Sequence, residues 1–222
     1  MAPEIQPSGK ARIEPRIEPL FDEAALRESV SEMGRKLAAD FDGSDGSDEP
    51  LLLAILGGSV IFLADLVRAI QRPVLFELMQ VGYSAGGEAA GAAGEMKAAG
   101  AAGELKAAAA AGEVKAAGAA DTVQNIHYPI PVEIAGRRVV VLKDVVSSGV
   151  IEVYLGEQVR QHGAREVRFA ALIDLLDERK TDFELDYRAF TTRRKGVFVG
   201  YGLKHEGRYG NLPYIGRLPE TA

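Results

Sequence analysis

Cysteine is absent from the 222 residues of this chain, and histidine occurs only three times. The lack of cysteine excludes disulfide bonds and thiolate zinc sites, and it agrees with a reducing cytosol. The histidines are far apart in the sequence and form no pattern of metal ligands: His127, His162 and His205. We therefore expect a cytoplasmic protein without a structural metal centre.

Excess positive charge and long apolar segments are also missing. The net charge is −6 and the isoelectric point about 5.2, so the chain as a whole is unsuited to nucleic acids and anionic membranes. The longest apolar stretch, 51–63, is interrupted by Gly57, Gly58 and Ser59 and is shorter than the roughly 20 residues of a membrane helix. Residues 1–10 have neither the basic start nor the apolar run of a signal peptide. We expect a soluble protein that binds neither nucleic acid nor membrane.

Apolar and amphipathic segments, by contrast, are plentiful and alternate along the chain. Hydrophobic residues make up 47% of the sequence, enough for the core of one domain. Asp22 can cap a helix over 22–41, whose apolar residues recur at helical spacing. The expected strands are 51–56, 74–80, 139–146, 168–174, 186–190 and 197–201, and further helices begin after Ser59 and after Gly149. This alternation predicts an α/β fold with a mostly parallel sheet.

Three segments lie outside that pattern. Residues 1–19 contain Arg-Ile-Glu-Pro twice, and prolines four apart exclude a helix, so we expect a flexible N-terminal arm. Residues 84–122 form an Ala/Gly-rich inserted loop that contains three tandem nonapeptides, GEMKAAGAA, GELKAAAAA and GEVKAAGAA. Alanine favours helix, but each repeated glycine costs about 0.5–1 kcal/mol, so we expect this loop to be disordered or marginally helical. An extended loop over 125–131 follows it. The domain itself spans 20–218, and 219–222 are a tail.

Two glycine-bearing turns follow buried strands, which is where open α/β sheets bind ligands. The first is Gly57-Gly58-Ser59. The second, over 147–151, is Ser147-Ser148-Gly149-Val150-Ile151, and it opens a helix. Main-chain N–H groups, the helix dipole and two hydroxyls there could hold a phosphate. A plain tight turn would have the same sequence, and from the residues alone both interpretations stay open.

Four blocks of sequence resemble a known family. The stretch 139–149, VVVLKDVVSSG, is similar to the motif by which type I phosphoribosyltransferases hold phosphoribosyl pyrophosphate: four apolar residues, Glu-Asp, two apolar residues and Asp-Thr-Gly-x-Thr. LGGSVIFLADL at 56–66, ALID at 171–174, and VGYGL with YGNLPYIG within 199–216 resemble the hypoxanthine-guanine branch. The resemblance implies a type I phosphoribosyltransferase fold: a mostly parallel central sheet flanked by helices, with a small hood formed from the chain ends.

The resemblance also implies roles for the residues of the phosphate-binding turn. The family's general base corresponds to Ser147, whose hydroxyl cannot accept a proton as a carboxylate does, so no catalytic residue is intact there. Ser148 and Ile151 stand in place of threonines, while Gly149 is retained and Val150 lies between. The turn therefore keeps phosphate-binding groups and loses its base.

Other implied site positions are altered as well. In the ribose and pyrophosphate region, Asp144 keeps a carboxylate, but the carboxylate before it is replaced; the positions are Lys143, Asp144, Gly57, Gly58 and Lys204. Gly210 stands where the family has a pyrophosphate-binding arginine. In the base pocket, Leu175 replaces the lysine that reads the purine. Val197 replaces the stacking aromatic residue, unless a slip of one residue brings Phe198 there.

Magnesium is the family's cofactor, and its ligand positions are occupied by Lys143 and Lys204. An ammonium group cannot coordinate magnesium and repels it. We therefore expect no metal and no other cofactor. The two lysines either bind a phosphate-bearing small molecule in place of the metal or are solvated surface charges; both interpretations stay open.

Three functions are compatible with the sequence. The leading hypothesis is a hypoxanthine-guanine phosphoribosyltransferase homologue with little or no catalysis, which binds a purine nucleotide or regulates an active phosphoribosyltransferase as a homo- or hetero-oligomer. The alternative, favoured by Asp144, is an active purine salvage enzyme that makes a nucleoside monophosphate and pyrophosphate from a purine base and phosphoribosyl pyrophosphate. A third is a structural partner that binds no ligand. The inserted loop over 84–122 sits where the family has its lid, and its composition suits a lid poorly.

Overall fold

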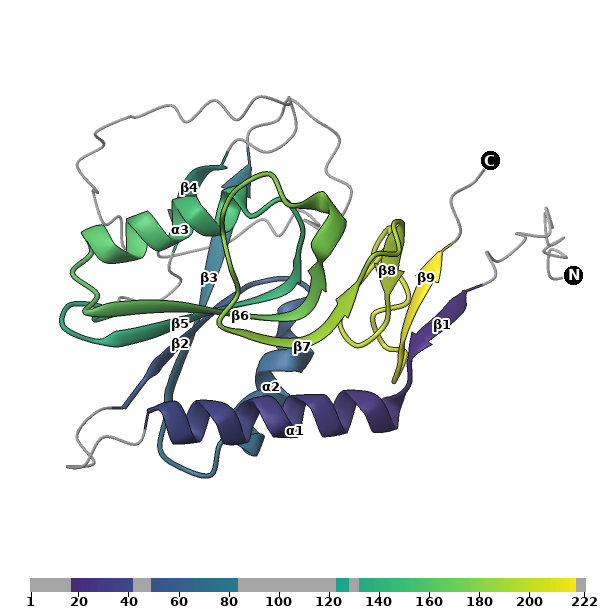
Figure 1. The fold of residues 1–222 in the computed structure, drawn as a ribbon, viewed down its shortest axis with the longest axis horizontal. Coiled ribbons are helices and arrows are strands. Elements are labelled where there is room, and N and C mark those ends of the chain that lie inside the picture. Colours follow the sequence, from purple (N-terminus) through teal and green to yellow (C-terminus); the bar gives the residue numbers. More distant parts are fainter. Residues whose placement is uncertain (1–16, 42–48, 84–122, 128–131, 219–222) are drawn as a thin grey trace, which may run out of the picture.

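The computed structural model of the protein describes residues 17–41, 49–83, 123–127 and 132–218. Its strands form a six-stranded sheet in the order β4-β3-β2-β5-β6-β7 and a three-stranded sheet in the order β1-β9-β8 (Figure 1). The large sheet consists of β2 (Leu51–Ile55), β3 (Leu75–Tyr83), β4 (Val123–His127), β5 (Arg138–Val146), β6 (Glu166–Leu175) and β7 (Tyr187–Thr192). All neighbouring pairs in it are parallel except β3 with β4 at one edge. The expected α/β class and the mostly parallel sheet are confirmed.

Helices cover the two faces of this sheet. On one face lie α1 (Glu23–Asp40) and α2 (Ser59–Ala69), and on the other lies α3 (Val150–Gln161) (Figure 1). Alternate residues of the central strands supply two cores: Leu52 and Leu142 pack with α1 and α2, whereas Leu53 and Val141 pack with α3. Strands buried on both faces read as continuous apolar runs, which is why the sequence predicts β2 and β5 well. A short 3₁₀ helix, η1 (Leu176–Glu178), follows β6.

The small sheet is the expected hood, built from the two ends of the domain. It contains β1 (Glu18–Phe21), β8 (Val197–Val199) and β9 (Ile215–Leu218), all antiparallel. Glu18 on β1 forms ion pairs with Arg194 and Arg217, and the hydrogen bond from Arg217 is the main cause that lowers the pKa of this carboxyl. The Phe21 ring stacks on Phe190 of β7 with centroids 4.1 Å apart, so the hood is joined to the main sheet.

The helix predicted over 22–41 is α1, and Asp22 caps it by accepting a hydrogen bond from the Ala25 N–H at 2.8 Å. One expectation is wrong: within the loop expected over 125–131, residues 125–127 belong to strand β4, which pairs with β3. Strand β4 forms because β3 supplies its hydrogen bonds at the sheet edge, and the local sequence of β4 does not indicate this pairing. The end of that segment, 128–131, most of the arm (1–16), the repeat loop (84–122) and the tail (219–222) lie outside the described residues. Among those described, no helix is long and apolar enough to cross a membrane.

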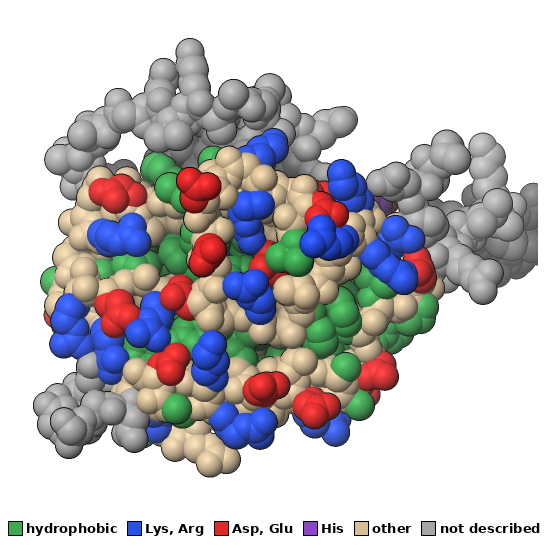
Figure 2. Space-filling view, viewed as in Figure 1, with side chains coloured by type: hydrophobic (Ala, Val, Ile, Leu, Met, Phe, Trp, Pro, Cys, Tyr) green, Lys and Arg blue, Asp and Glu red, His purple; other side chains and the backbone are tan. Residues whose placement is uncertain are grey.

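Charges of both signs are mixed on the face of the molecule that Figure 2 draws. Figure 2 shows lysine and arginine side chains interspersed with aspartate and glutamate on the face that it draws. The described residues of this face form no continuous basic stripe of the kind that tracks a nucleic-acid backbone.

Candidate functional site

Three separate segments meet at the carboxyl edge of the sheet. They are the turn after β2, the end of β5 and the hood turn after β8. A Cβ atom built on Gly58 would overlap the Asp144 carboxylate and lie 2.9 Å from Leu203 Cδ2, and one on Gly202 would overlap the Gly58 carbonyl oxygen. Glycine is required at Gly202, where the obstacle is backbone, whereas a larger residue at Gly58 would displace the Asp144 side chain. A Cβ on Gly57 would meet nothing within 4 Å, so that predicted site position faces open space.

Asp144 and Lys143 leave β5 on opposite faces of the sheet, as successive strand residues do. Asp144 lies on the same face of β5 as Leu142 and points toward the hood. Its Oδ1 accepts a hydrogen bond from the Val145 N–H at 2.8 Å. Lys143 lies on the same face of β5 as Val141 and points toward α3. The structure therefore brings Asp144, and not Lys143, to the point where the three segments meet.

Lys143 forms an ion pair with Glu152 in the first turn of α3. The Nζ to Oε1 distance is 2.5 Å, and the two side chains are only 14% and 2% exposed. This contradicts the interpretation of Lys143 as a solvated surface charge. The sequence analysis missed Glu152, although its spacing from Leu155 and Val159 places it on the buried face of the helix.

We call the predicted phosphate-binding turn, residues 147–151, the phosphate turn. Gly149 precedes α3 with φ of 80°, a left-handed conformation that suits glycine. The Val150 N–H donates to Ser148 Oγ at 3.4 Å, so that hydroxyl lies at the start of the helix. The first N–H groups of a helix have no intrahelical acceptor and can bind an anion. The Ile151 side chain is buried in the core beside α3, so only its main chain is available to a ligand.

Residues 179–183, the covering segment, lie against this turn and were not predicted to do so. Arg179 donates to the Ser147 carbonyl at 3.1 Å, and the Lys180 N–H donates to the Ser148 carbonyl at 2.9 Å. A Cβ on Gly149 would lie 2.5 Å from Thr181 Oγ1, which shows how closely the segment approaches. The covering segment thus occupies the carbonyl oxygens of Ser147 and Ser148.

Asp174, at the end of β6, holds the covering segment in place. Its side chain is 1% exposed and forms an ion pair with Arg179, while Arg188 Nη1 lies 3.3 Å from its other oxygen. A carboxylate so deeply buried is tolerated because it has charged partners. The sequence placed Asp174 at a strand end but gave no indication of these partners, which come from a loop and from β7.

The predicted base-pocket residues differ in burial. Leu175 is buried in the core, and Phe198 is buried there too, paired across the hood with Arg217 on β9. Val197 is 37% exposed on the opposite face of β8. Phe198 turns its ring into the core and Val197 lies on the other face of β8, as alternation along a strand requires.

Lys204 is exposed on the hood turn and lies over Gly210. A Cβ on Gly210 would be 2.8 Å from Lys204 Cγ and 3.3 Å from its Cε. The Gly202 N–H donates to the Gly210 carbonyl at 2.9 Å, which fixes the two arms of the turn against each other. The stem of Lys204 therefore occupies the space that a larger side chain at 210 would need.

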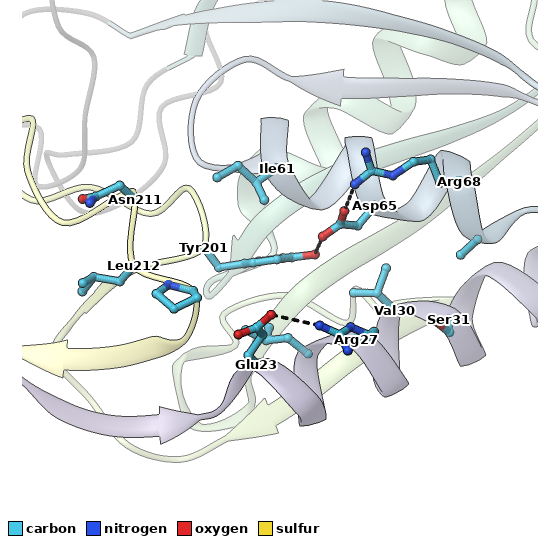
Figure 3. Close-up of a pocket in the computed structure, with 13 residues that line it drawn as sticks. Glu23, Arg27, Val30, Ser31, Ile61, Asp65, Arg68, Tyr201, Asn211 and Leu212 are labelled. Carbon is cyan, nitrogen blue, oxygen red and sulfur yellow. Dashed lines mark hydrogen bonds and ion pairs between the residues drawn. The ribbon is translucent and has the colours of Figure 1, made fainter.

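A groove of about 570 Å³ lies apart from the predicted residues, between α1, α2 and the hood turn (Figure 3). Its charged side chains are paired with one another: Glu23 with Arg27 and Asp65 with Arg68. The Tyr201 hydroxyl donates to Asp65 at 2.5 Å, and burial together with this carboxylate raises the pKa of the tyrosine above its ordinary value. The hydrogen bond from Tyr201 to Asp65 links the hood turn to α2 at this groove.

A magnesium ion at the carboxyl edge would have few side-chain ligands among the described residues. Magnesium takes oxygen ligands in near-octahedral geometry. Within the described part of the chain, no three residues among His, Cys, Asp and Glu lie close enough to hold a metal ion. Asp144 contributes one carboxylate, and lysines stand at positions 143 and 204.

Comparison with known proteins agrees with the fold. A model described as a phosphoribosyl transferase domain matches residues 27–206. The chain is 29% identical to the hypoxanthine-guanine phosphoribosyltransferase of Streptococcus pneumoniae over 195 residues, which is 88% of this chain and 89% of that one. It is also 29% identical to the enzyme of the same name from Bacillus subtilis over 199 residues, covering 90% and 91% of the two chains.

Among solved structures, a hypoxanthine-guanine phosphoribosyltransferase from Bacillus anthracis matches with a TM-score of 0.69 and 25% identity, covering 93% of this chain and all of that one (100%). A hypoxanthine phosphoribosyltransferase from Staphylococcus aureus has the same fold, with a TM-score of 0.70 and 21% identity over 96% of this chain and 97% of that one. The chain therefore belongs to the phosphoribosyltransferase family, in its hypoxanthine-guanine branch.

Proposed function

We propose that this protein binds a purine nucleotide through its phosphate group at the phosphate turn, and that it has little or no transferase activity. The observation that carries the proposal is the turn itself, with Gly149 in a left-handed conformation and Ser148 Oγ at the N-terminus of α3. Hydroxyl and main-chain donors at a helix N-terminus suit a phosphate monoester. The names of the relatives point to purine substrates, which sets the class of ligand.

The proposed loss of transfer follows from three side chains. Ser147 stands at the position of the family's general base, and a hydroxyl is far too weakly basic to take its place. Leu175 is buried in the core and has no polar group to read a purine oxygen. Lys143 is turned toward α3 and offers no oxygen to a ribose. Each change removes a group that a transfer mechanism of the family type requires.

We further propose that binding needs no metal ion. Magnesium would otherwise supply positive charge between the protein and the phosphates of the ligand. Lys204 is exposed on the hood turn and carries a positive charge that needs no metal. Asp144, which faces the hood, is placed to accept hydrogen bonds from ribose hydroxyls.

The test combines an activity assay with a binding assay. Purified protein is incubated with hypoxanthine, guanine, xanthine or adenine, phosphoribosyl pyrophosphate and magnesium, and inosine and guanosine monophosphates are titrated by calorimetry with and without a chelator. We expect no turnover above background, binding that survives the chelator, and weaker binding in Ser148→Ala. Turnover that disappears in Asp144→Asn would instead establish the active salvage enzyme.

A second candidate, regulation within an oligomer, rests on exposed apolar side chains. Leu56, Val60 and Ile61 are 41%, 41% and 38% exposed around the turn after β2. Neighbouring apolar side chains of this kind mark contact surfaces. A homo-oligomer, or a hetero-oligomer with an active phosphoribosyltransferase, would cover them. Light scattering of the protein alone and mixed with such an enzyme, with Val60→Glu as the disrupting variant, tests this role.

A further inference from the structure

Glu152 is an unusual residue to find beside an anion-binding turn. It lies in the first turn of α3, its side chain is 2% exposed, and its partner is Lys143 on β5. Glutamate is almost never fully buried without such a partner. The ion pair with Lys143 therefore compensates for the burial of the Glu152 carboxylate.

The position of Glu152 matters for electrostatics as well as for packing. A helix N-terminus attracts anions through its dipole and its unpaired N–H groups. A fixed carboxylate in the same turn would repel a phosphate bound there. The Lys143 ammonium, 2.5 Å from that carboxylate, cancels the negative charge at close range.

We propose that Lys143 and Glu152 are a positioning pair that keeps the start of α3 electrically suited to a phosphate monoester. Neither residue touches the ligand. Lys143 acts by neutralising Glu152, and Glu152 acts by holding Lys143 inside the protein, under α3. The inference rests on the proposed function, because it concerns the same turn, and it assigns a role to a pair that the family motif does not contain.

A purely structural pair would behave differently from a charge-balancing one. If the pair only held α3 in place, removing either partner would weaken both folding and phosphate binding. Charge balance instead predicts opposite signs for binding. Lys143→Met leaves the Glu152 carboxylate next to the turn without the ammonium, whereas Glu152→Gln removes that carboxylate and keeps the ammonium.

The first experiment measures guanosine monophosphate and inorganic phosphate binding by calorimetry in the full chain. We expect Lys143→Met to weaken binding about fivefold and Glu152→Gln to strengthen it about threefold, on the scale of charge effects at helix ends. Both single variants should unfold at lower urea concentration than the parent protein. The double variant, neutral at both positions, should bind about as the parent does. Weakened binding in Glu152→Gln would overturn the proposal, and this variant with the double one decides the matter even where Lys143→Met fails to fold.

A second experiment needs no ligand. Since the chain contains no cysteine, Ser148→Cys introduces a single thiol at the start of α3. Its thiolate absorbance, followed against pH, reports the local potential. We expect the thiol pKa to be lowest with Glu152→Gln, intermediate with the intact pair and highest with Lys143→Met. The same value in all three backgrounds would overturn the proposal, whereas this order in a protein that binds no phosphate would refute the proposed function alone.

Discussion

Asp174 offers a quantitative test of how the phosphate turn is supported. Its carboxylate is 1% exposed and pairs with Arg179, which in turn donates to the Ser147 carbonyl at 3.1 Å. Asp174→Asn keeps the shape of the side chain and removes its charge. Removing one partner of a buried ion pair costs about 3–5 kcal/mol, because the other charge stays buried. Arg188, the second partner, is 41% exposed and keeps much of its hydration, so we expect the lower end, about 3 kcal/mol.

The same substitution three residues later provides the control. Asp177 pairs with Arg193, but these side chains are 41% and 71% exposed, and exposed pairs contribute about 0–1 kcal/mol. Urea denaturation of the two variants measures the difference directly. Thermal unfolding should show a melting temperature about 6–12 °C lower for Asp174→Asn, given about 2–4 °C per kcal/mol at this size. Trypsin should also cleave after Arg179 faster in Asp174→Asn. Equal losses of stability in the two variants would refute the assignment of Asp174 as the support of the covering segment.

Two further predictions concern backbone conformation and pH. Gly149→Ala should lower the free energy of unfolding by more than Gly136→Ala, because both positions have positive φ but only the first lies against the covering segment; the left-handed conformation alone costs about 1–2 kcal/mol. Urea denaturation compares them, and equal effects would contradict the close approach at the turn. Because burial and its carboxylate partner raise the pKa of Tyr201 above 10.0, the folded state favours the neutral phenol. That stabilisation is complete below the unfolded pKa and is lost as the pH rises toward the folded pKa, so stability should fall above about pH 10 and fall less in Tyr201→Phe.

The elements predicted well from the sequence are those whose pattern is set by their own residues. Strand β2 and residues 139–142 of β5 are buried on both faces and form continuous apolar runs. Helix α1 has a capping side chain at Asp22 and apolar residues at helical spacing. Strand β4 was missed because its hydrogen bonds come from β3, across the whole inserted loop. Pairing at a sheet edge depends on the neighbour more than on the local sequence.

The candidate site also contains features that the sequence predicts and features that it does not. The glycine turns were found because glycine itself marks positive φ and close approach, as at Gly58 and Gly149. The partners of the charged residues were not found, because Glu152 for Lys143 and Arg179 for Asp174 are fixed by tertiary packing. Spacing along α3 could have placed Glu152 on the buried face. Nothing in the local sequence could have placed the covering segment on the turn.

The two lysines at the implied magnesium positions show how such changes fit a conserved fold. Lys143 forms a buried ion pair with Glu152, and this pair joins the strand to the helix. Lys204 lies in space that is open only because residue 210 is glycine. Each lysine thus comes with a second residue that satisfies its charge or accommodates its volume. Changes of this kind leave the parallel sheet undisturbed, because they occur at its carboxyl edge.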